Sequence, residues 1–293
     1  MAEPLQERPM IAALWMCGSI VSFISMAIAG RAVAGVHDTF EIMTWRSLIG
    51  LGIVLALGRA SGQLGQISTR RLPAHLVRNV FHFSGQNLWF YALTQISLAQ
   101  VFALEFTSPV WVILLSPLIL GERITRPRAI AAILGFVGVL IVVRPGAVPL
   151  SPGLMAAAGC AIGFAVSTLM TRDMAKSGEG VISIMFWLTL MQFCFALVLS
   201  LWDGQTTLPT AQTMPWLGVI GIAGVGAHYC LTRALGLAPA GFVAPIDFIR
   251  LPMIALMGAA FYGEHLDPAV LIGALVIFCG NWINIRAQTR ATT

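Results

Sequence analysis

The chain has 293 residues, of which 58% are hydrophobic and only 10% are charged, and its mean hydropathy is +0.86. A soluble domain carries about 25% charged residues, so the composition excludes an ordinary soluble protein and indicates an integral membrane protein. The formal net charge of +5 does not indicate a nucleic-acid partner, because the basic residues lie between apolar segments.

Ten apolar segments follow one another, each close to the roughly 20 residues that a helix needs to cross a bilayer. Together they occupy about two-thirds of the chain, which leaves no room for a soluble catalytic or nucleotide-binding domain. The sequence therefore predicts an all-α integral membrane protein of ten transmembrane helices in the lipid bilayer. In chain order these are Pro9–Gly30, Thr39–Leu57, His75–Thr94, Leu98–Leu120, Arg128–Val143, Gly153–Thr171, Val181–Leu201, Pro215–Arg233, Ala240–Tyr262 and Ala269–Ile285.

The first apolar segment resembles a secretory signal peptide, because Arg8 precedes an apolar stretch that ends in Ala27-Ile28-Ala29. The stretch is longer than the apolar region of a typical signal peptide. It also has a counterpart in the second half of the chain, since one constant offset aligns Gly18 with Gly159 and Arg31 with Arg172. We therefore expect the segment to be retained as the first helix.

The positions of the basic residues predict an orientation. If the N-terminus is cytoplasmic, 13 of the 17 Lys and Arg residues lie inside or at inner helix ends, and only Arg31 and Arg144 lie outside. Cytoplasmic loops of membrane proteins carry such an excess, so we expect the cell (inner) membrane with both termini in the cytoplasm. The inner residues are Arg8, Arg59, Arg70, Arg71, Arg78, Arg123, Arg126, Arg128, Arg172, Lys176, Arg233, Arg286 and Arg290.

The five cysteines lie inside apolar segments and show no metal-binding spacing. We interpret them as small packing residues and expect neither a metal nor a cofactor. They are Cys17, Cys160, Cys194, Cys230 and Cys279.

The chain repeats itself at a constant offset, most visibly where Gly121-Glu122 recurs as Gly263-Glu264. We call the shift that carries Glu122 onto Glu264 the repeat offset. Five predicted helices per half is an odd number, so the second half must cross the membrane in the opposite sense. Such an inverted repeat is typical of secondary transporters. We expect a first repeat over residues 1–145 and a second over residues 146–293. The two glutamates then lie at opposite membrane faces, and we interpret them as structural caps.

Four ionisable residues stand inside predicted spans, namely Arg46, Glu105, Asp247 and Arg250. Charges in a bilayer are costly and face the bundle interior or a cavity, and these four sum to zero. Asp247 and Arg250 are three residues apart, which would place them on one helix face. At the repeat offset Glu105 aligns with Asp247. Two structural alternatives stay open: an ion pair confined to the ninth span, and a bond from Arg46 to Glu105.

Further polar and aromatic residues accompany these charges. His82 and Gln86 share a stripe on the third span, and Gln86 aligns with His228 at the repeat offset. The histidines could be hydrogen-bonded interior residues or proton carriers. Trp15, Trp89 and Tyr229 could supply flat apolar walls to a binding cavity.

Prolines lie inside the spans that carry the repeated acids, among them Pro109 in the fourth span, and Pro245 and Pro252 in the ninth. Proline removes a backbone donor and bends a helix. Bent helices beside a central site would suit alternating access, so these residues are hinge candidates, and packing kinks are the alternative.

The stretch from Phe90 to Pro145 carries a specific resemblance. It contains Tyr91-Ala92-Leu93, a proline in the next span, Leu120-Gly121-Glu122 and a span that ends in Gly138-Val139-Leu140-Ile141. This ordered set resembles one repeat of the drug/metabolite transporter superfamily, EamA type, and the residues from Arg233 to Gly280 match it more loosely. Trp45-Arg46 is similar to the family's arginine position. The resemblance implies ten helices in two inverted groups of five around a central cavity.

The resemblance implies transport of amino acids, nucleoside-like metabolites or drugs, commonly by export. Our leading hypothesis is a secondary transporter, an exporter of small amphipathic metabolites such as amino acids, that works by alternating access. An amino acid would use Arg250 or Arg46 for its carboxylate and Glu105 or Asp247 for its ammonium group. The alternative is an uptake carrier or exchanger for a nucleoside-like metabolite such as S-adenosylmethionine.

A membrane-embedded enzyme is less favoured, because the chain has no His-x-x-x-His pair and no Gly-x-Ser-x-Gly motif. It also has no Walker A motif, which disfavours a primary pump. Proton coupling through Glu105, Asp247 or a histidine stays open, as does the choice between a monomer and a homodimer.

Overall fold

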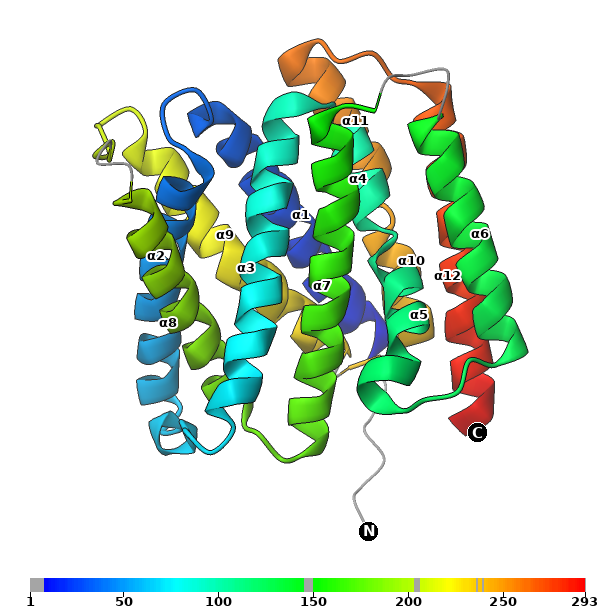
Figure 1. The fold of residues 1–293 in the computed structure, drawn as a ribbon, viewed down its shortest axis with the longest axis horizontal. Coiled ribbons are helices and arrows are strands. Elements are labelled where there is room, and N and C mark those ends of the chain that lie inside the picture. Colours follow the sequence, from blue (N-terminus) through cyan, green and yellow to red (C-terminus); the bar gives the residue numbers. More distant parts are fainter. Residues whose placement is uncertain (1–7, 145–149, 203–205, 236, 239, 293) are drawn as a thin grey trace.

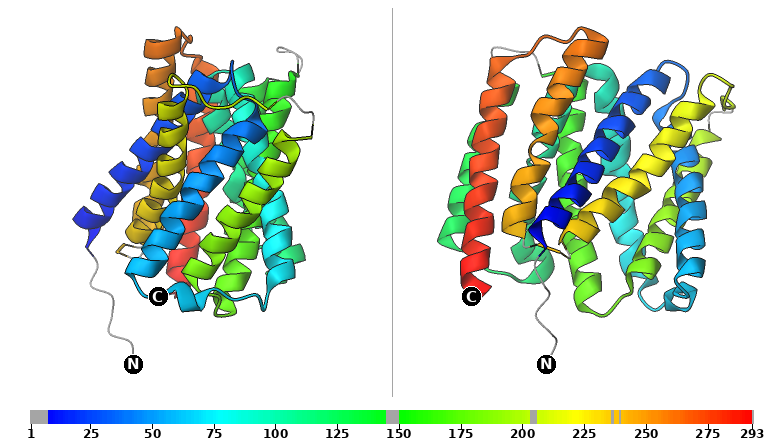
Figure 2. Two further views of the ribbon diagram at one scale, coloured as in Figure 1. Left: turned by 90° about the vertical axis from the view of Figure 1, so that its left-hand side faces the viewer. Right: turned by 180° about the vertical axis from the view of Figure 1, so that it is seen from behind.

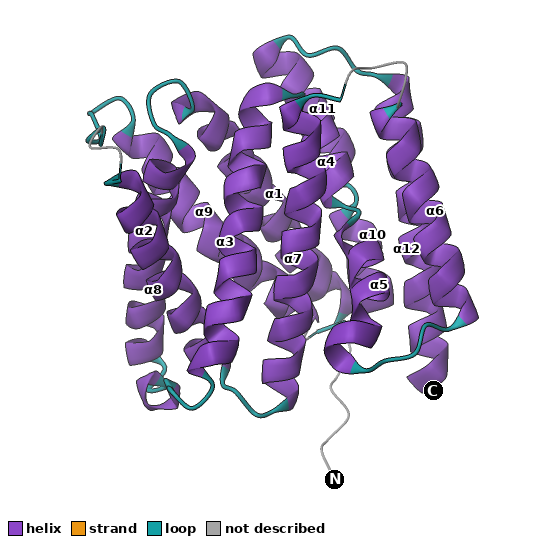
Figure 3. Ribbon diagram, in the orientation of Figure 1, coloured by secondary structure: helices purple, strands orange, loops and turns teal. Residues whose placement is uncertain are grey.

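Helices joined by short loops make up the structure (Figure 1). The computed structural model describes residues 8–292 except residues 145–149, 203–205, 236 and 239. These residues contain no strand (Figure 3). A short 3-10 helix, Leu64–Gln66, follows α2. The α-helices are α1 (Pro9–Val33), α2 (Thr39–Ala60), α3 (Leu72–Gln95), α4 (Leu98–Glu105), α5 (Ser108–Leu120), α6 (Arg126–Val143), α7 (Pro152–Lys176), α8 (Val181–Ser200), α9 (Met214–Leu235), α10 (Ala240–Asp247), α11 (Arg250–Tyr262) and α12 (Pro268–Thr292).

Two segments predicted as continuous helices are broken, which corrects the prediction. A turn at residues 106–107 separates α4 from α5, and a turn at residues 248–249 separates α10 from α11. Proline is compatible with both breaks, because Pro109 is the second residue of α5 and Pro252 the third of α11. In the first turn of a helix the missing N–H costs nothing. Asp247 and Arg250 therefore lie on two different helices, not on one helix face.

Eight helical segments are long and apolar enough to cross a membrane, by length and composition among the described residues. They are α1, α2, α4 with α5, α6, α7, α8, α9 and α12. The two other predicted spans are α3, whose middle carries polar residues, and the pair α10 and α11. The arrangement is that of a multi-pass membrane protein. The start of α1 and the end of α12 lie at the same end of the bundle (Figures 1 and 2).

The most extensive helix contacts join the two halves of the chain: α1 with α9, α3 with α7, α2 with α8 and α6 with α12. At the repeat offset, α1 corresponds to α7, α2 to α8, α3 to α9 and α6 to α12. Exchanging corresponding helices converts the pair of α1 and α9 into the pair of α7 and α3. The same exchange leaves the pairs of α2 with α8 and of α6 with α12 unchanged. A two-fold relation between the halves would produce this pattern. In Figure 1, α1 runs upward and its counterpart α7 runs downward.

Glycines allow the backbones to approach where these helices cross. A Cβ atom on Gly138 of α6 would lie 2.6 Å from the carbonyl oxygen of Gly273 on α12. Between α3 and α7, a Cβ on Gly163 would lie 2.8 Å from the carbonyl oxygen of Phe81. Small residues of this kind let helices pack closely in lipid, where apolar bulk alone gives no driving force.

The two Gly-Glu turns have the same backbone geometry. Gly121 ends α5 with a φ of 67°, and Gly263 ends α11 with a φ of 63°. This left-handed conformation at a helix C-terminus favours glycine. The local repeat in the sequence is therefore also a local repeat in structure.

Candidate functional site

The two helix breaks meet in the interior through one arginine. Arg250 begins α11, Glu105 ends α4 and Asp247 ends α10. The Arg250 Nη2 atom lies 3.4 Å from Glu105 Oε1 and 3.3 Å from Asp247 Oδ2. One structural alternative left open by the sequence was a bond from Arg46 to Glu105. This alternative is wrong, because the arginine that pairs with Glu105 is Arg250.

Each of these three charges is unfavourable to its own helix. A helix C-terminus carries partial negative charge and an N-terminus partial positive charge. Glu105 and Asp247 nevertheless lie at C-termini, and Arg250 lies at an N-terminus. The three charges therefore stabilise one another. If α4, α10 and α11 moved apart, the unfavourable interaction of each charge with its own helix end would no longer be offset.

Aromatic rings enclose the arginine. Its guanidinium carbon lies 4.2 Å from the ring centre of Phe23, 4.6 Å from that of Phe106 and 5.2 Å from that of Phe102. Such cation–π contacts stabilise a desolvated cation. Phe106 also stacks on Phe248, with ring centres 4.4 Å apart. These two phenylalanines align at the repeat offset, so the repeat-related turns touch each other.

Trp89 has a polar role in addition to its expected role as a wall. Its indole Nε1 donates a hydrogen bond to Glu105 Oε2 over 2.8 Å, and the side chain is buried. Glu105 is thereby held between an indole donor and a guanidinium. A carboxylate with two such partners is well fixed in position.

In a second polar group, the ionisable side chains are all basic. Arg46 on α2 and Arg78 and His82 on α3 are all buried. His82 Nδ1 lies 3.2 Å from Ser167 Oγ, and the ring of His228 on α9 is centred 6.4 Å from that of His82. Arg78 donates from Nε to Thr171 Oγ1 over 2.6 Å. Among the described residues, no carboxylate forms an ion pair with either arginine.

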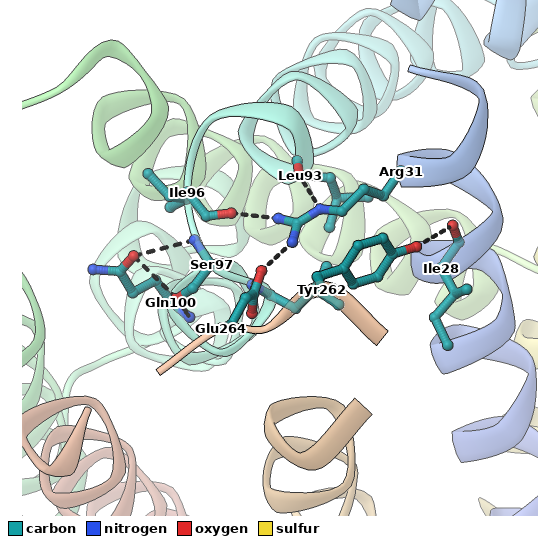
Figure 4. Close-up of polar contacts among 9 residues, drawn as sticks. Ile28, Arg31, Leu93, Ile96, Ser97, Gln100, Tyr262 and Glu264 are labelled. Carbon is teal, nitrogen blue, oxygen red and sulfur yellow. Dashed lines mark hydrogen bonds and ion pairs between the residues drawn. The ribbon is translucent and has the colours of Figure 1, made fainter. Parts of the chain in front are cut away.

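An ion pair joins the two halves at the end of the bundle that is uppermost in Figure 1, and Figure 4 shows its contacts. Arg31, near the end of α1, pairs with Glu264 and also donates to the carbonyl oxygens of Leu93, over 2.7 Å from Nε, and of Ile96. Glu264 in turn accepts the Leu98 N–H, at 2.9 Å. The carboxylate therefore ties the end of α1 to the start of α4.

The lower end carries the corresponding pair. Glu122 Oε1 lies 2.9 Å from Arg172 Nη2, and Glu122 Oε2 lies 3.2 Å from Arg128 Nη1. Partial burial would raise the pKa of Glu122, but the positive charges of Arg172 and Arg128 outweigh it and lower that pKa. The sequence repeat aligns Arg31 with Arg172 and Glu264 with Glu122. Both glutamates thus bridge the halves, a role that goes beyond capping.

The two ends differ in tightness. The Arg31 and Glu264 side chains are 16% and 14% exposed, whereas Arg172 is 45% exposed and Glu122 is 20% exposed. The upper pair also engages backbone groups at the end of α3 and the start of α4. The upper pair is therefore the less exposed of the two, whereas the lower glutamate has three basic partners, Arg128, Arg172 and Lys176.

The sequence model of the EamA-like transporter family matches residues 10–144 and 151–286, which is nearly the whole chain in two copies. The chain belongs to the EamA-like transporter family. The resemblance seen in the residues of the two Gly-Glu regions is confirmed.

Several named relatives align with this transporter over most of its length. A riboflavin transporter from Vibrio cholerae serotype O1 is 29% identical over 280 residues, covering 93% of this chain and 92% of the relative. One from Brucella anthropi is 31% identical over 222 residues, covering 74% and 77%. An S-adenosylmethionine uptake transporter from Rickettsia conorii is 23% identical over 281 residues, covering 94% and 93%.

A solved crystal structure has the same fold. It superposes with a TM-score of 0.67 at 18% identity, covering 96% of this chain and 99% of the other. At this level of identity the likeness speaks for the fold alone.

The other cavity and hinge residues predicted from the sequence lie at separate positions in the structure. Gln86 is buried on α3, and its Oε1 has no hydrogen-bond partner among the described residues. Trp15 and Tyr229 contact each other edge to face at 5.7 Å, but Tyr229 is 43% exposed. Tyr229 is therefore more exposed than the buried His82. Pro245 lies within α10.

A small cavity of about 130 Å³ lies beside the helix breaks. Asp247 Oδ1 and Asn281 Oδ1 have no hydrogen-bond partner among the described residues. A larger cavity of about 380 Å³ between α3 and α8 is almost wholly apolar and lies apart from the charges. The smaller cavity is lined by Phe106, Pro109, Asp247, Phe248, Asn281, Asn284 and Ile285.

Sequence reasoning missed three features of this region. Arg78 was assigned to an inner helix end, yet it is buried one helical turn before His82 on the same face of α3. The pairs of Arg31 and Arg172 with the Gly-Glu glutamates were also missed. The repeat already aligned both arginines and both glutamates, so their pairing could have been sought from that correspondence.

Proposed function

We propose that this transporter takes up a small heterocyclic metabolite by alternating access, with its substrate site at the helix breaks between the halves. The observation that carries the proposal is the group formed by Glu105, Asp247 and Arg250, in which broken helices from both halves meet. Broken helices at a repeat interface are the usual setting of substrate sites in secondary transporters.

The relatives favour the uptake alternative over the leading hypothesis of amino-acid export. Proteins named as riboflavin transporters and as S-adenosylmethionine uptake transporters align over most of this chain. Both molecules contain a nitrogen heterocycle, and neither name refers to an amino-acid exporter. The aromatic residues around Arg250 suit a planar ring, which can stack on aromatic side chains.

The inverted arrangement of the halves is part of the proposal. Its support is the set of helix contacts that exchange with the halves, together with the opposite directions of α1 and α7 (Figure 1). The repeats would comprise residues 1–145 and 146–293. Their boundary falls in residues 145–149, which lie outside the described residues.

The two end pairs support alternating access. Arg31 with Glu264 and Arg172 with Glu122 each join the first helix of one half to the Gly-Glu turn of the other half. Opening one end would break one pair while the other remains. Pro109 and Pro252 lie where α5 and α11 begin, so the half-helices can tilt there without losing a regular hydrogen bond. Pro245, inside α10, is the third hinge candidate.

The orientation follows from the basic residues. The lower end of Figure 1 holds the start of α6 and the end of α7, which carry Arg128, Arg172 and Lys176, and also the start of α1 and the end of α12. The excess of Lys and Arg on one side marks the cytoplasmic side. We therefore place both termini in the cytoplasm, so that the upper end, with the pair of Arg31 and Glu264, faces outward.

Transport by purified protein in proteoliposomes tests the proposal. We expect saturable uptake of labelled riboflavin or S-adenosylmethionine, and its loss on substitution Asp247→Asn. Gly52→Ala is the matched control, because a Cβ there meets no atom within 4 Å. Uptake measured with and without a pH gradient separates proton coupling from facilitated exchange. Transport of amino acids alone, or of no compound tested, would contradict the proposal.

A further inference from the structure

Arg46 is a buried cation that has no partner in the part of the chain that the structure describes. Its side chain lies on α2 and the residue is 8% exposed. Its Nε has no hydrogen-bond partner, and no hydrogen bond, ion pair or ring contact of Arg46 is found among the described residues. A guanidinium has five N–H donors and no acceptor, so all of its bonding capacity is unused within the described protein.

The neighbours of Arg46 cannot neutralise it. Its charge interacts with the imidazoles of His82 and His228. An imidazole can accept a hydrogen bond only when it is neutral, and it then carries no negative charge. Arg78, the other buried arginine of this group, also lacks a carboxylate among the described residues. Arg250 differs sharply, because it has two carboxylates and three aromatic rings.

The space for the guanidinium depends on a glycine. A Cβ atom on Gly224 of α9 would lie 2.9 Å from Arg46 Nε and 3.1 Å from Arg46 Nη2. The position equivalent to Gly224 in the first half is His82, since the repeat offset aligns the two. The first half therefore has an imidazole at this position, whereas the second half has a glycine, which leaves space for the Arg46 guanidinium.

The four charges identified in the sequence, namely Arg46, Glu105, Asp247 and Arg250, do sum to zero, but among the described residues only the last three pair with one another. Arg46 and Arg78 contribute two positive charges without an acid, while Glu105, Asp247 and Arg250 together contribute one negative charge. A buried cation without a counter-ion is costly. In a membrane such a residue faces a cavity or a substrate path, and stability is commonly given up at positions that function requires.

We propose that Arg46 determines substrate specificity by donating hydrogen bonds to an acceptor oxygen of the transported molecule. This rests on the proposed transport function. A planar guanidinium matches paired acceptors, either the ring carbonyls of a neutral heterocycle or the oxygens of a carboxylate or phosphate. The transporter therefore favours neutral and anionic substrates and rejects cations. Among the molecules named for the relatives, riboflavin is neutral and offers ring carbonyls. S-adenosylmethionine also offers a carboxylate, but its ammonium and sulfonium groups give it a net positive charge, which Arg46 and Arg78 would repel.

The first test needs no substrate. The thermal stability of the purified protein in detergent is measured for Arg46→Met and for Arg250→Met. Removing an unpaired buried charge should raise the melting temperature by a few degrees, whereas Arg250→Met should lower it, because it leaves Glu105 and Asp247 unpaired. A fall for Arg46→Met comparable to that for Arg250→Met would mean that Arg46 is structural, and would overturn the proposal.

The second test measures binding of three probes: riboflavin, riboflavin 5′-phosphate and S-adenosylmethionine. We expect Arg46→Gln to weaken binding of the first or second probe at least tenfold, Arg46→Lys to weaken it less, and Gly224→Ala to weaken it by crowding the guanidinium. Tighter binding of the phosphate than of riboflavin identifies an anion as the ligand group, and the reverse identifies ring carbonyls. Preference of the unaltered protein for S-adenosylmethionine overturns the proposal.

The outcomes separate this proposal from the transport function. Uptake that is unchanged in Arg46→Gln leaves the transport function standing and overturns the role of Arg46. Arg46-dependent binding without uptake in proteoliposomes supports the role of Arg46 and contradicts transport. Failure of all three probes to bind overturns the assigned ligand chemistry, whatever the stability measurements give.

Discussion

Arg250 connects the two broken helices at the level of single residues. It contacts acids at the ends of α4 and α10 and begins α11. The sequence placed Arg250 correctly inside a span and paired it with Asp247, but it did not reveal Glu105 as the second partner. The break between residues 247 and 250 is what turns the guanidinium toward both carboxylates.

Replacing Arg250 by Gln should destabilise the protein strongly. Two largely buried carboxylates would lose their shared cation, and breaking a buried ion pair by removing one partner costs about 3–5 kcal/mol. Chemical denaturation in detergent measures the loss. The matched control is Arg250→Gln combined with Glu105→Gln, which removes one of the orphaned charges and should recover part of the stability. Equal stability of the single variant and the unaltered protein would show that the group is not coupled as described.

At the level of helices, two contacts repeat at opposite ends of the bundle. The Gly-Glu turn of each half accepts an arginine from the first helix of the other half. Each pair fastens its own end, so the two pairs can be broken independently.

Glu264→Gln should loosen the upper end alone, and Glu122→Gln the lower end alone. An amide keeps the shape of the carboxylate but loses its charge, so the pairs with Arg31 and Arg172 weaken. Hydrogen exchange followed by mass spectrometry should show faster exchange around Leu98 in the first variant and around Arg128 in the second. The idea fails if both variants change exchange at the same end.

Close packing of α6 on α12 depends on glycine. Gly138→Ala should lower the melting temperature, because its Cβ would lie 2.6 Å from a backbone carbonyl oxygen that cannot move aside cheaply. Gly52→Ala, on the exposed face of α2, removes backbone freedom without a clash and should be neutral or stabilising by about 0.5–1 kcal/mol. Similar effects of the two substitutions would contradict the packing described.

At the scale of the whole molecule, the start of α1 and the end of α12 lie at one end of the bundle (Figure 1). A reporter protein that matures only in the cytoplasm, fused after Thr293, should become active, because the basic residues favour a cytoplasmic C-terminus. The control fusion places the same reporter after Val36, between α1 and α2, where it should stay inactive. An active reporter at the second position and an inactive one at the first would reverse the orientation.

Much of the fold was predictable because it depends on local composition. Long apolar runs predicted the spans, and the recurrence of Gly121-Glu122 predicted a doubled architecture of the family type. The breaks within Leu98–Leu120 and Ala240–Tyr262 were harder to predict from the sequence. Proline permits a bend, but tertiary contacts decide whether the helix ends. The structure shows both turns stacked on each other through Phe106 and Phe248, a contact between the halves.

The charged group at the helix breaks was predictable as a set of residues but not as a set of pairs. Glu105, Asp247 and Arg250 were all identified, since a charge inside an apolar run is conspicuous. Arg78 was missed because its place near a helix end resembled that of a solvent-exposed basic residue. Pairing requires knowledge of which helices are neighbours, and that information is spread over the whole chain.

The sequence by itself determined the class of protein, the repeat and the family, because each follows from local hydropathy or from the order of short motifs. Only the tertiary structure decided which partners the buried charges have. It brought Arg250 to two carboxylates, closed the upper end with Arg31 and Glu264, and left Arg46 without a partner among the described residues. The physical reason is that a charge in a low-dielectric interior is governed by groups within a few ångströms, and folding alone determines which groups those are.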